Sequence, residues 1–186
     1  LRSIHEGGVG RIVDICANAD SYRAVLDLAH KYPFIYAAVG VHPDDVGKLD
    51  EAFFSQIERA ACDDKCVAIG EIGLDFYYGT DDREEQQELF RKQIRLANEL
   101  KMPIMIHSRD AHQLTMDILK EEGAFSEERT TWFPKRPSPG TLSSVATGHD
   151  IKLPGETDGM VPDARVQMHC FSGSPELALE YIKLGA

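Results

Sequence analysis

Short apolar runs alternate along the chain with longer segments in which apolar residues recur every three or four positions. The short runs are rich in Val, Ile and Ala and have the length of buried strands, whereas the longer segments have the periodicity of a helix with one apolar face. Expected strands lie at 10–17, 34–41, 66–71, 102–107 and 165–169, and expected helices at 20–31, 50–61, 82–100, 110–122 and from 174 onward. This alternation predicts an α/β fold with a parallel sheet and right-handed crossovers.

Polar residues near the ends of several expected helices support these boundaries. Asp20 is a candidate N-cap, and Asp82 with Glu85 has the spacing of a capping box. Ser174 precedes a proline, which is favoured at the first position of a helix. We therefore expect helices to begin at these residues.

The strand–helix units repeat at roughly 25 to 35 residues, the spacing found in a (β/α)₈ barrel of about 250 residues. Five such units are expected here, which fits either an open doubly wound sheet or part of a parallel (β/α)₈ TIM-type barrel. Gly70 and Gly73 lack the spacing of a nucleotide-binding loop, so a dinucleotide fold loses its main support.

The segment 124–164 interrupts the pattern. Five of the nine prolines lie in it, and it shows no sustained periodicity. Loops of this length are uncommon in compact domains and are usually functional or disordered. We interpret 124–164 as an insertion in a single domain spanning 1–186, and we favour a solvated surface insertion over a lid that grips substrate.

Composition narrows the functional classes. The formal net charge of −11 disfavours a general nucleic-acid coat, which needs a basic face. It does not exclude an enzyme acting on phosphodiesters, because bound divalent cations invert the local field. The apolar runs are far shorter than the roughly 20 residues that span a bilayer, so no membrane partner is expected.

The cysteines indicate where in the cell the protein is located, and the first residue indicates whether the chain is part of a longer protein. The four cysteines contain no Cys-x-x-Cys pair and are too sparse for a disulfide framework, so we predict free thiols and a cytoplasmic location. The chain begins with Leu1 and lacks a secretion signal. We expect it to be part of a longer protein.

Four ionisable side chains end or follow expected strands. Glu71, His107 and His169 each end an apolar run, and His42 directly follows another. Because ligands bind at the carboxyl ends of parallel strands, these residues are expected to converge. Imidazole with carboxylate suits Zn²⁺, Mn²⁺ or Fe²⁺, and phosphate ligands would also allow Mg²⁺. Such an ion lowers the pKa of bound water and supports hydrolysis.

Neighbouring residues have possible supporting roles. Asp75 could orient a ligand histidine or cap the loop that follows its strand. Arg109 could clamp a phosphate or form a surface ion pair with Asp110 or the loop of Glu71. Cys170 is rejected as a ligand, because adjacent residues in a strand point to opposite faces. The remaining histidines are expected to have no role at the site: His5, His30, His112 and His149.

Four segments, in chain order, resemble the successive signatures of the TatD family of metal-dependent hydrolases. They are Gly40–Pro43, Gly70–Phe76, Pro103–Ala111 and His169–Gly173. The resemblance implies a metallo-dependent (β/α)₈ barrel and a divalent-metal deoxyribonuclease or related phosphodiesterase activity.

The resemblance also implies roles for individual residues. It places metal ligation on Glu71, His107 and His169 and brings His42 to the site. The chain lacks the family's first-strand His-x-His pair and last-strand Asp, and the insertion replaces a short link. We therefore expect about five βα units of the barrel, with the first and last strands missing.

Our leading hypothesis is a cytoplasmic hydrolase that cleaves DNA phosphodiesters with one or two divalent ions (Mg, Zn or Mn). In it, His42 and Arg109 act catalytically, with Arg109 steadying a phosphate. One alternative is an amide or ester hydrolase of the amidohydrolase type, and another is an inactive truncated module. The sequence makes no prediction of oligomeric state.

Overall fold

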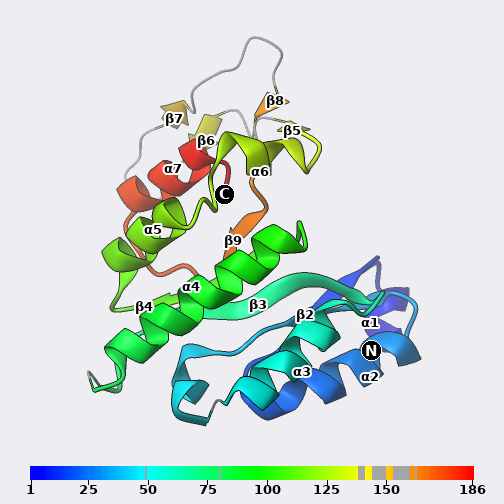
Figure 1. Cartoon of the computed structure of the whole chain (residues 1–186). Coiled ribbons are helices and arrows are strands. Elements are labelled where there is room, and N and C mark those ends of the chain that lie inside the picture. Colours follow the sequence, from blue (N-terminus) through cyan, green and yellow to red (C-terminus); the bar gives the residue numbers. More distant parts are fainter. Residues whose placement is uncertain (49, 80, 138–140, 144–149, 153–159, 162) are drawn as a thin grey trace.

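A five-stranded parallel sheet forms the centre of the protein (Figure 1). The computed structural model describes residues 1–48, 50–79, 81–137, 141–143, 150–152, 160–161 and 163–186. The strand order is β1-β2-β3-β4-β9, and the strands are β1 (Ile12–Ile15), β2 (Ile35–Val39), β3 (Cys66–Asp75), β4 (Ile104–Arg109) and β9 (Val166–Met168). The sheet curls into half of a TIM-type barrel, which confirms the predicted partial barrel.

Helices connect the strands and cover one face of the sheet (Figure 1). The helices are α1 (Arg2–Glu6), α2 (Tyr22–Lys31), α3 (Glu51–Ala61), α4 (Arg83–Glu99), α5 (His112–Glu121), α6 (Glu127–Thr131) and α7 (Pro175–Leu184), with 3₁₀ turns η1 (Ala19–Ser21) and η2 (Pro43–Lys48). Further short strands are β5 (Arg136–Pro137), β6 (Thr141–Ser143), β7 (Asp150–Lys152) and β8 (Met160–Val161). In the described part of the chain, every helix is too short or too polar to cross a bilayer.

Helix α4 packs its apolar stripe on the middle of the sheet, as its periodicity predicts. Phe90, Ile94 and Ala97 are fully buried and belong to the same core cluster as Ile104 and Ile106 of β4. Residues alternate between the two faces of a strand, so Met105 and His107 of β4 point to the opposite face of the sheet. That face carries a groove of about 850 Å³, lined mostly by apolar side chains.

One of the three predicted helix starts needs correction, and a second start is right but lacks the predicted capping bond. Helix α2 begins at Tyr22 with Ser21 as its N-cap, so Asp20 lies one residue too early, within the 3₁₀ turn η1. Asp82 is the N-cap of α4, but its carboxylate accepts from the side chain of Gln86 rather than from the helix backbone. Ser174 caps α7 as predicted and accepts from Leu177 N–H.

Strands β3 and β4 are longer than predicted, because their ionisable residues do not end them. Glu71 lies inside β3, which runs on to Asp75, and β4 continues past His107 to pair Arg109 with Asp75. Gly73 allows this close pairing: its φ is +146°, and a Cβ there would overlap the carbonyl oxygen of His107. Ordinary side chains rarely adopt that conformation.

Both ends of the predicted insertion pack against the core. Arg129 of α6 is fully buried, and its guanidinium donates to Ala164 O at 2.8 Å, Met102 O at 2.8 Å and Asn98 Oδ1 at 2.7 Å. Much of the segment between these ends lies outside the described residues. The choice between surface insertion and lid stays a prediction.

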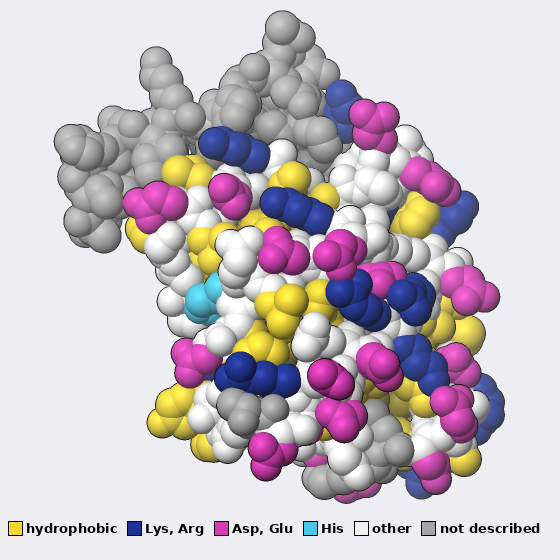
Figure 2. Space-filling view, turned by 60° about the vertical axis from the view of Figure 1, so that its left-hand side comes forward, with side chains coloured by type: hydrophobic (Ala, Val, Ile, Leu, Met, Phe, Trp, Pro, Cys, Tyr) yellow, Lys and Arg dark blue, Asp and Glu magenta, His cyan; other side chains and the backbone are white. Residues whose placement is uncertain are grey.

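The surface carries charges of both signs. On the face shown in Figure 2, Lys and Arg side chains are interspersed with Asp and Glu, and the coloured residues form no continuous basic area. This distribution agrees with the formal net charge of −11. A nucleic-acid ligand would therefore meet little long-range attraction on this face.

Candidate metal centre

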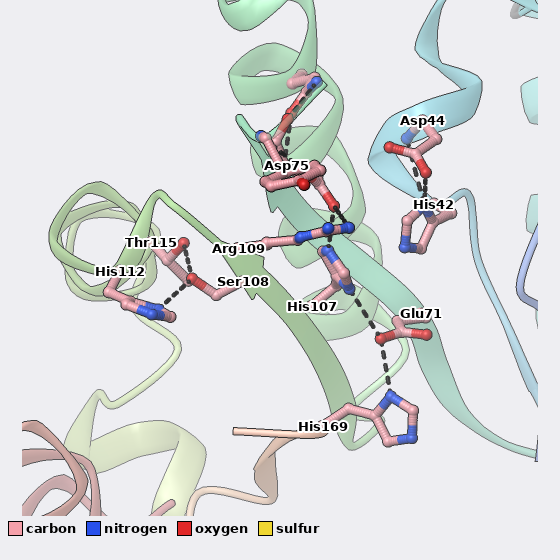
Figure 3. Close-up of polar contacts among 12 residues, drawn as sticks. His42, Asp44, Glu71, Asp75, His107, Ser108, Arg109, His112, Thr115 and His169 are labelled. Atoms are coloured by element: carbon pink, nitrogen blue, oxygen red, sulfur yellow. Dashed lines mark hydrogen bonds and ion pairs between the residues drawn. The ribbon is translucent and has the colours of Figure 1, made fainter. Parts of the chain in front are cut away.

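Side chains from three neighbouring strands meet at Glu71 (Figure 3). Its side chain is 8% exposed, and its Oε1 atom lies 2.8 Å from His169 Nδ1 and 3.3 Å from His107 Nδ1. His107 lies in β4, and His169 follows β9, where its N–H donates to Ile106 O and extends the pairing of β4 with β9. The structure thus brings together the three predicted metal ligands.

His42 completes the cluster from the end of β2. One possible ligand atom from each of His42, Glu71 and His107 lies within 4.8 Å of the others. The His42 and His107 rings are 4.4 Å apart and inclined at 65°. Burial, together with the positive charge of a protonated His107, lowers the pKa of His42. His42 is therefore neutral near pH 7 and keeps a lone pair for a cation.

Asp75 orients the His107 ring, in agreement with the predicted supporting role. Its Oδ2 atom lies 2.9 Å from His107 Nε2, while its Oδ1 atom accepts from Tyr77 N–H at 3.0 Å. A proton on Nε2 directed at this carboxylate leaves Nδ1 of neutral His107 to face Glu71 with its lone pair. This is the usual way in which a carboxylate fixes the tautomer of a ligand histidine.

The electrostatics of the cluster favour bound positive charge. Burial raises the pKa of Glu71, but hydrogen bonds from His107 and His169 outweigh it and lower that pKa to about 2. Burial likewise lowers the pKa of His107, and its bonds to Glu71 and Asp75 outweigh this and raise it. Glu71 is thus anionic at neutral pH and favours the protonated form of His107. A divalent cation would supply the same charge, so the donors fit the predicted ion.

Two buried glutamines of α4 hold the backbone next to the site through hydrogen bonds. Gln86 accepts from Asp75 N–H at 2.9 Å and donates to Asp75 O at 3.0 Å. Gln93 forms the same pair of bonds, at 2.7 and 3.1 Å, with Val41, the residue before His42. Sequence reasoning missed both residues. The available signal was two polar residues seven positions apart on an otherwise apolar helix face.

Arg109 lies beside the cluster and does not contact Glu71 in Figure 3. Its Nη1 atom is 3.7 Å from Asp75 Oδ2, and its side chain is 39% exposed. A hydrogen bond with Tyr78 raises the pKa of Arg109 further. The partners of Arg109 are therefore Asp75 and Tyr78, which lie in the segment after Glu71 that the sequence offered as one alternative.

One other expectation is corrected, and one residue expected to have no role at the site has a structural contact. Cys170 was excluded by strand alternation, but β9 ends at Met168, and Cys170 Sγ lies 3.8 Å from His169 Nε2. That reason for excluding it is therefore wrong. His112, expected to have no role, has its Nδ1 atom 3.0 Å from Ser108 Oγ, which also bonds Thr115. This contact joins β4 to α5 (Figure 3).

The fold and the cluster together define a class of protein: an α/β half-barrel with histidines and carboxylates grouped where its parallel strands end, as in barrel-type metal-dependent hydrolases. The model of the family described as "TatD related DNase" matches residues 1–186, so the chain belongs to this family.

Individual relatives agree with this assignment. A Bacillus subtilis protein named "Uncharacterized metal-dependent hydrolase YabD" is 34% identical over 95% of this chain and 54% of its own length. A Pectobacterium carotovorum protein named "3'-5' ssDNA/RNA exonuclease TatD" is 37% identical over 78% of this chain and 53% of its own length. The crystal structure of the TatD homologue YjjV from Escherichia coli superposes with a TM-score of 0.70 at 28% identity, over 100% of this chain and 57% of that one. The chain thus spans about half the length of these relatives.

Proposed function

We propose that the protein is a divalent-metal-dependent hydrolase that cleaves DNA phosphodiesters. The main support is that possible ligand atoms of His42, Glu71 and His107 lie within 4.8 Å of one another. His169 is bonded to the carboxylate of Glu71 as well. Family membership supports a metal-dependent hydrolase, and the exonuclease name of the Pectobacterium relative favours single-stranded nucleic acid as substrate.

Each residue has a distinct part in this proposal. Glu71, His107 and His169 hold the cation, and neutral His42 contributes a further donor or receives a proton from the attacking water. When bound, the ion lowers the pKa of a water molecule and polarises the phosphodiester. Arg109 presents an exposed guanidinium beside the cluster and steadies a phosphate oxygen through charge-assisted hydrogen bonds.

Location and metal identity also belong to the proposal. All four cysteines are free thiols, which fits the reducing cytoplasm. The donor set combines imidazole nitrogens with a carboxylate oxygen, which suits Zn²⁺ or Mn²⁺, and substrate phosphates would add the oxygens that Mg²⁺ prefers.

The test uses the protein in the full length that its gene encodes, stripped of metal and then supplied with Mg²⁺, Mn²⁺ or Zn²⁺. We expect metal-dependent cleavage of labelled single-stranded DNA. Glu71→Gln should abolish it, beyond the roughly 10- to 100-fold loss seen when a residue that only orients a ligand is removed. Glu88→Gln, on the exposed side of α4, is the matched control and should retain activity.

Three results would contradict the proposal. Full nuclease activity in Glu71→Gln would exclude the site. Hydrolysis of acyl substrates with no cleavage of DNA would instead support the amide or ester alternative. Stoichiometric metal binding without any hydrolysis would indicate an inactive module.

A further inference from the structure

Exposed aromatic side chains gather where the strands end. Tyr77 is 58% exposed and Tyr78 is 74% exposed, and both directly follow β3, close to Asp75. The preceding residue, Phe76, packs against the core, whereas neither tyrosine belongs to a core cluster of the described residues. Burial in the protein interior therefore does not account for these two rings.

The two tyrosines and Arg109 form one stacked unit. The tyrosine rings lie 4.9 Å apart in an edge-to-face arrangement at 87°. The Cζ atom of Arg109 lies 3.7 Å from the centre of the Tyr77 ring and 4.9 Å from that of Tyr78. Such cation–π contacts are attractive and favour this arrangement of the exposed rings. The three side chains therefore present one joint aromatic and cationic surface.

This unit is tied to the candidate metal centre through Asp75. One oxygen of Asp75 contacts both His107 Nε2, at 2.9 Å, and Arg109 Nη1, at 3.7 Å. The other oxygen accepts from the backbone N–H of Tyr77. Figure 3 shows the side chains of Arg109 and His107 both directed toward Asp75. Anything that stacks on the tyrosines is therefore held next to the predicted ligands.

We propose that Tyr77, Tyr78 and Arg109 form a platform on which a nucleobase of a single-stranded substrate stacks, so that an adjacent phosphodiester reaches the metal centre. This inference rests on the proposed function and extends it to how the substrate is held. A nucleobase is the occupant that matches both parts of the platform, because its π-face stacks on aromatic rings and on guanidinium groups.

The charge of the chain favours recognition of bases by stacking rather than recognition of phosphates by a row of basic residues. With a formal net charge of −11, the chain repels a run of phosphates, whereas the face of a neutral base is not repelled in this way. Bases in a duplex are already stacked on each other, so the platform selects unpaired bases. Because every base has a π-face, little sequence preference is expected.

The test measures binding apart from cleavage. Fluorescence anisotropy is recorded with the full-length protein in EDTA, using a labelled oligothymidylate and an oligomer of the same length and charge whose nucleotides are abasic. Wild-type protein should bind oligothymidylate more tightly than the abasic oligomer. Tyr77→Ala or Tyr78→Ala should weaken oligothymidylate binding roughly 5- to 100-fold and leave abasic binding unchanged.

Matched variants separate stacking from other effects. Tyr77→Phe and Tyr78→Phe keep the rings and should bind oligothymidylate within about twofold of wild type by the same reasoning. Thermal unfolding should be unchanged in all four variants, because both side chains are exposed.

The outcomes distinguish the platform from the nuclease. Equal binding of the two oligomers by wild type, or unchanged binding in the alanine variants, overturns the platform even if DNA is cleaved. Loss of binding in the alanine variants, in a protein that never cleaves DNA with metal, supports the platform and overturns the proposed function instead.

Discussion

Asp75 Oδ2 lies 2.9 Å from Nε2 of His107, the ring nitrogen opposite the one that faces Glu71. The two carboxylates thus hold one imidazole from both sides. Glu71 faces the candidate metal position, and Asp75 determines which nitrogen of His107 keeps its proton.

Asp75→Asn should weaken binding of Mn²⁺ or Zn²⁺ by about 10- to 100-fold, because the neutral amide holds the His107 N–H less strongly and makes the ring a weaker donor. Calorimetric titration of metal into the stripped protein measures the change. Asp81→Asn, on the exposed surface before α4, should have no effect. Equal metal affinity in Asp75→Asn and wild type would show that Asp75 does not orient the ligand.

Gly73→Ala should destabilise the protein by about 3 kcal/mol or more, because an alanine is strained at a positive φ and its Cβ overlaps the His107 backbone. Gly79→Ala is the matched control, since a Cβ there meets no atom within 4 Å. Urea unfolding followed by circular dichroism measures both variants. Similar midpoints for the two would contradict the close pairing of β3 with β4.

Arg129→Met should cost about 3 kcal/mol of folding stability. Burial lowers the pKa of Arg129 to about 10, yet three neutral oxygen atoms still bind the cation. Removing the guanidinium leaves those buried acceptors without a donor, at about 1 to 3 kcal/mol each before relaxation. Arg59→Met on the exposed face of α3 should change stability by less than about 0.5 kcal/mol. The same urea assay compares the two variants. Equal stabilities would contradict a stabilising role for the buried Arg129 guanidinium.

The His30–Asp63 pair should make folding stability depend on pH. His30 Nε2 lies 2.9 Å from Asp63 Oδ1, and this hydrogen bond raises the pKa of His30 and lowers that of Asp63. The contribution of His30 is complete below its ordinary pKa of 6.5 and disappears as the pH rises through the raised value. That of Asp63 is complete above its ordinary pKa of 3.8 and disappears as the pH falls through the lowered value.

An NMR titration of His30 tests this pair. In Asp63→Asn the pKa of His30 should fall back toward 6.5, because the main cause of its rise is gone. Asp64→Asn should produce a smaller fall, since the Asp64 oxygen is 3.9 Å away. An unchanged His30 titration in Asp63→Asn would contradict the prediction.

The sequence predicts the strands and the residues near their ends, because both depend on local pattern. The apolar stripe Phe90, Ile94 and Ala97 follows from helical periodicity, and the meeting of Glu71 with His107 follows from the parallel order. Strand lengths were harder to predict. The apolar run stops at Glu71, which predicts a strand end there, but β3 continues to Asp75. The bonds of Glu71 to two histidines offset the cost of burying its charge.

The partners of the supporting residues could not be predicted, because they are distant in sequence. Gln93 bonds Val41, 52 positions away, and Arg129 bonds Ala164, 35 positions away. Neither residue differs by type from an ordinary surface residue. Only the folded arrangement shows that one supports the chain next to His42 and the other joins the two ends of the insertion.

The Arg129–Ala164 bond has a consequence for how this protein can vary. It closes the insertion at its base, five residues before His169, so the position of that histidine does not depend on the length of chain between the two anchors. Lengthening a closed loop is inexpensive, at about 0.6 kcal/mol for each doubling. The segment can therefore be exchanged as a module: sequences of different length and character can be grafted there while the part of the sheet that carries Glu71 and His107 stays as it is.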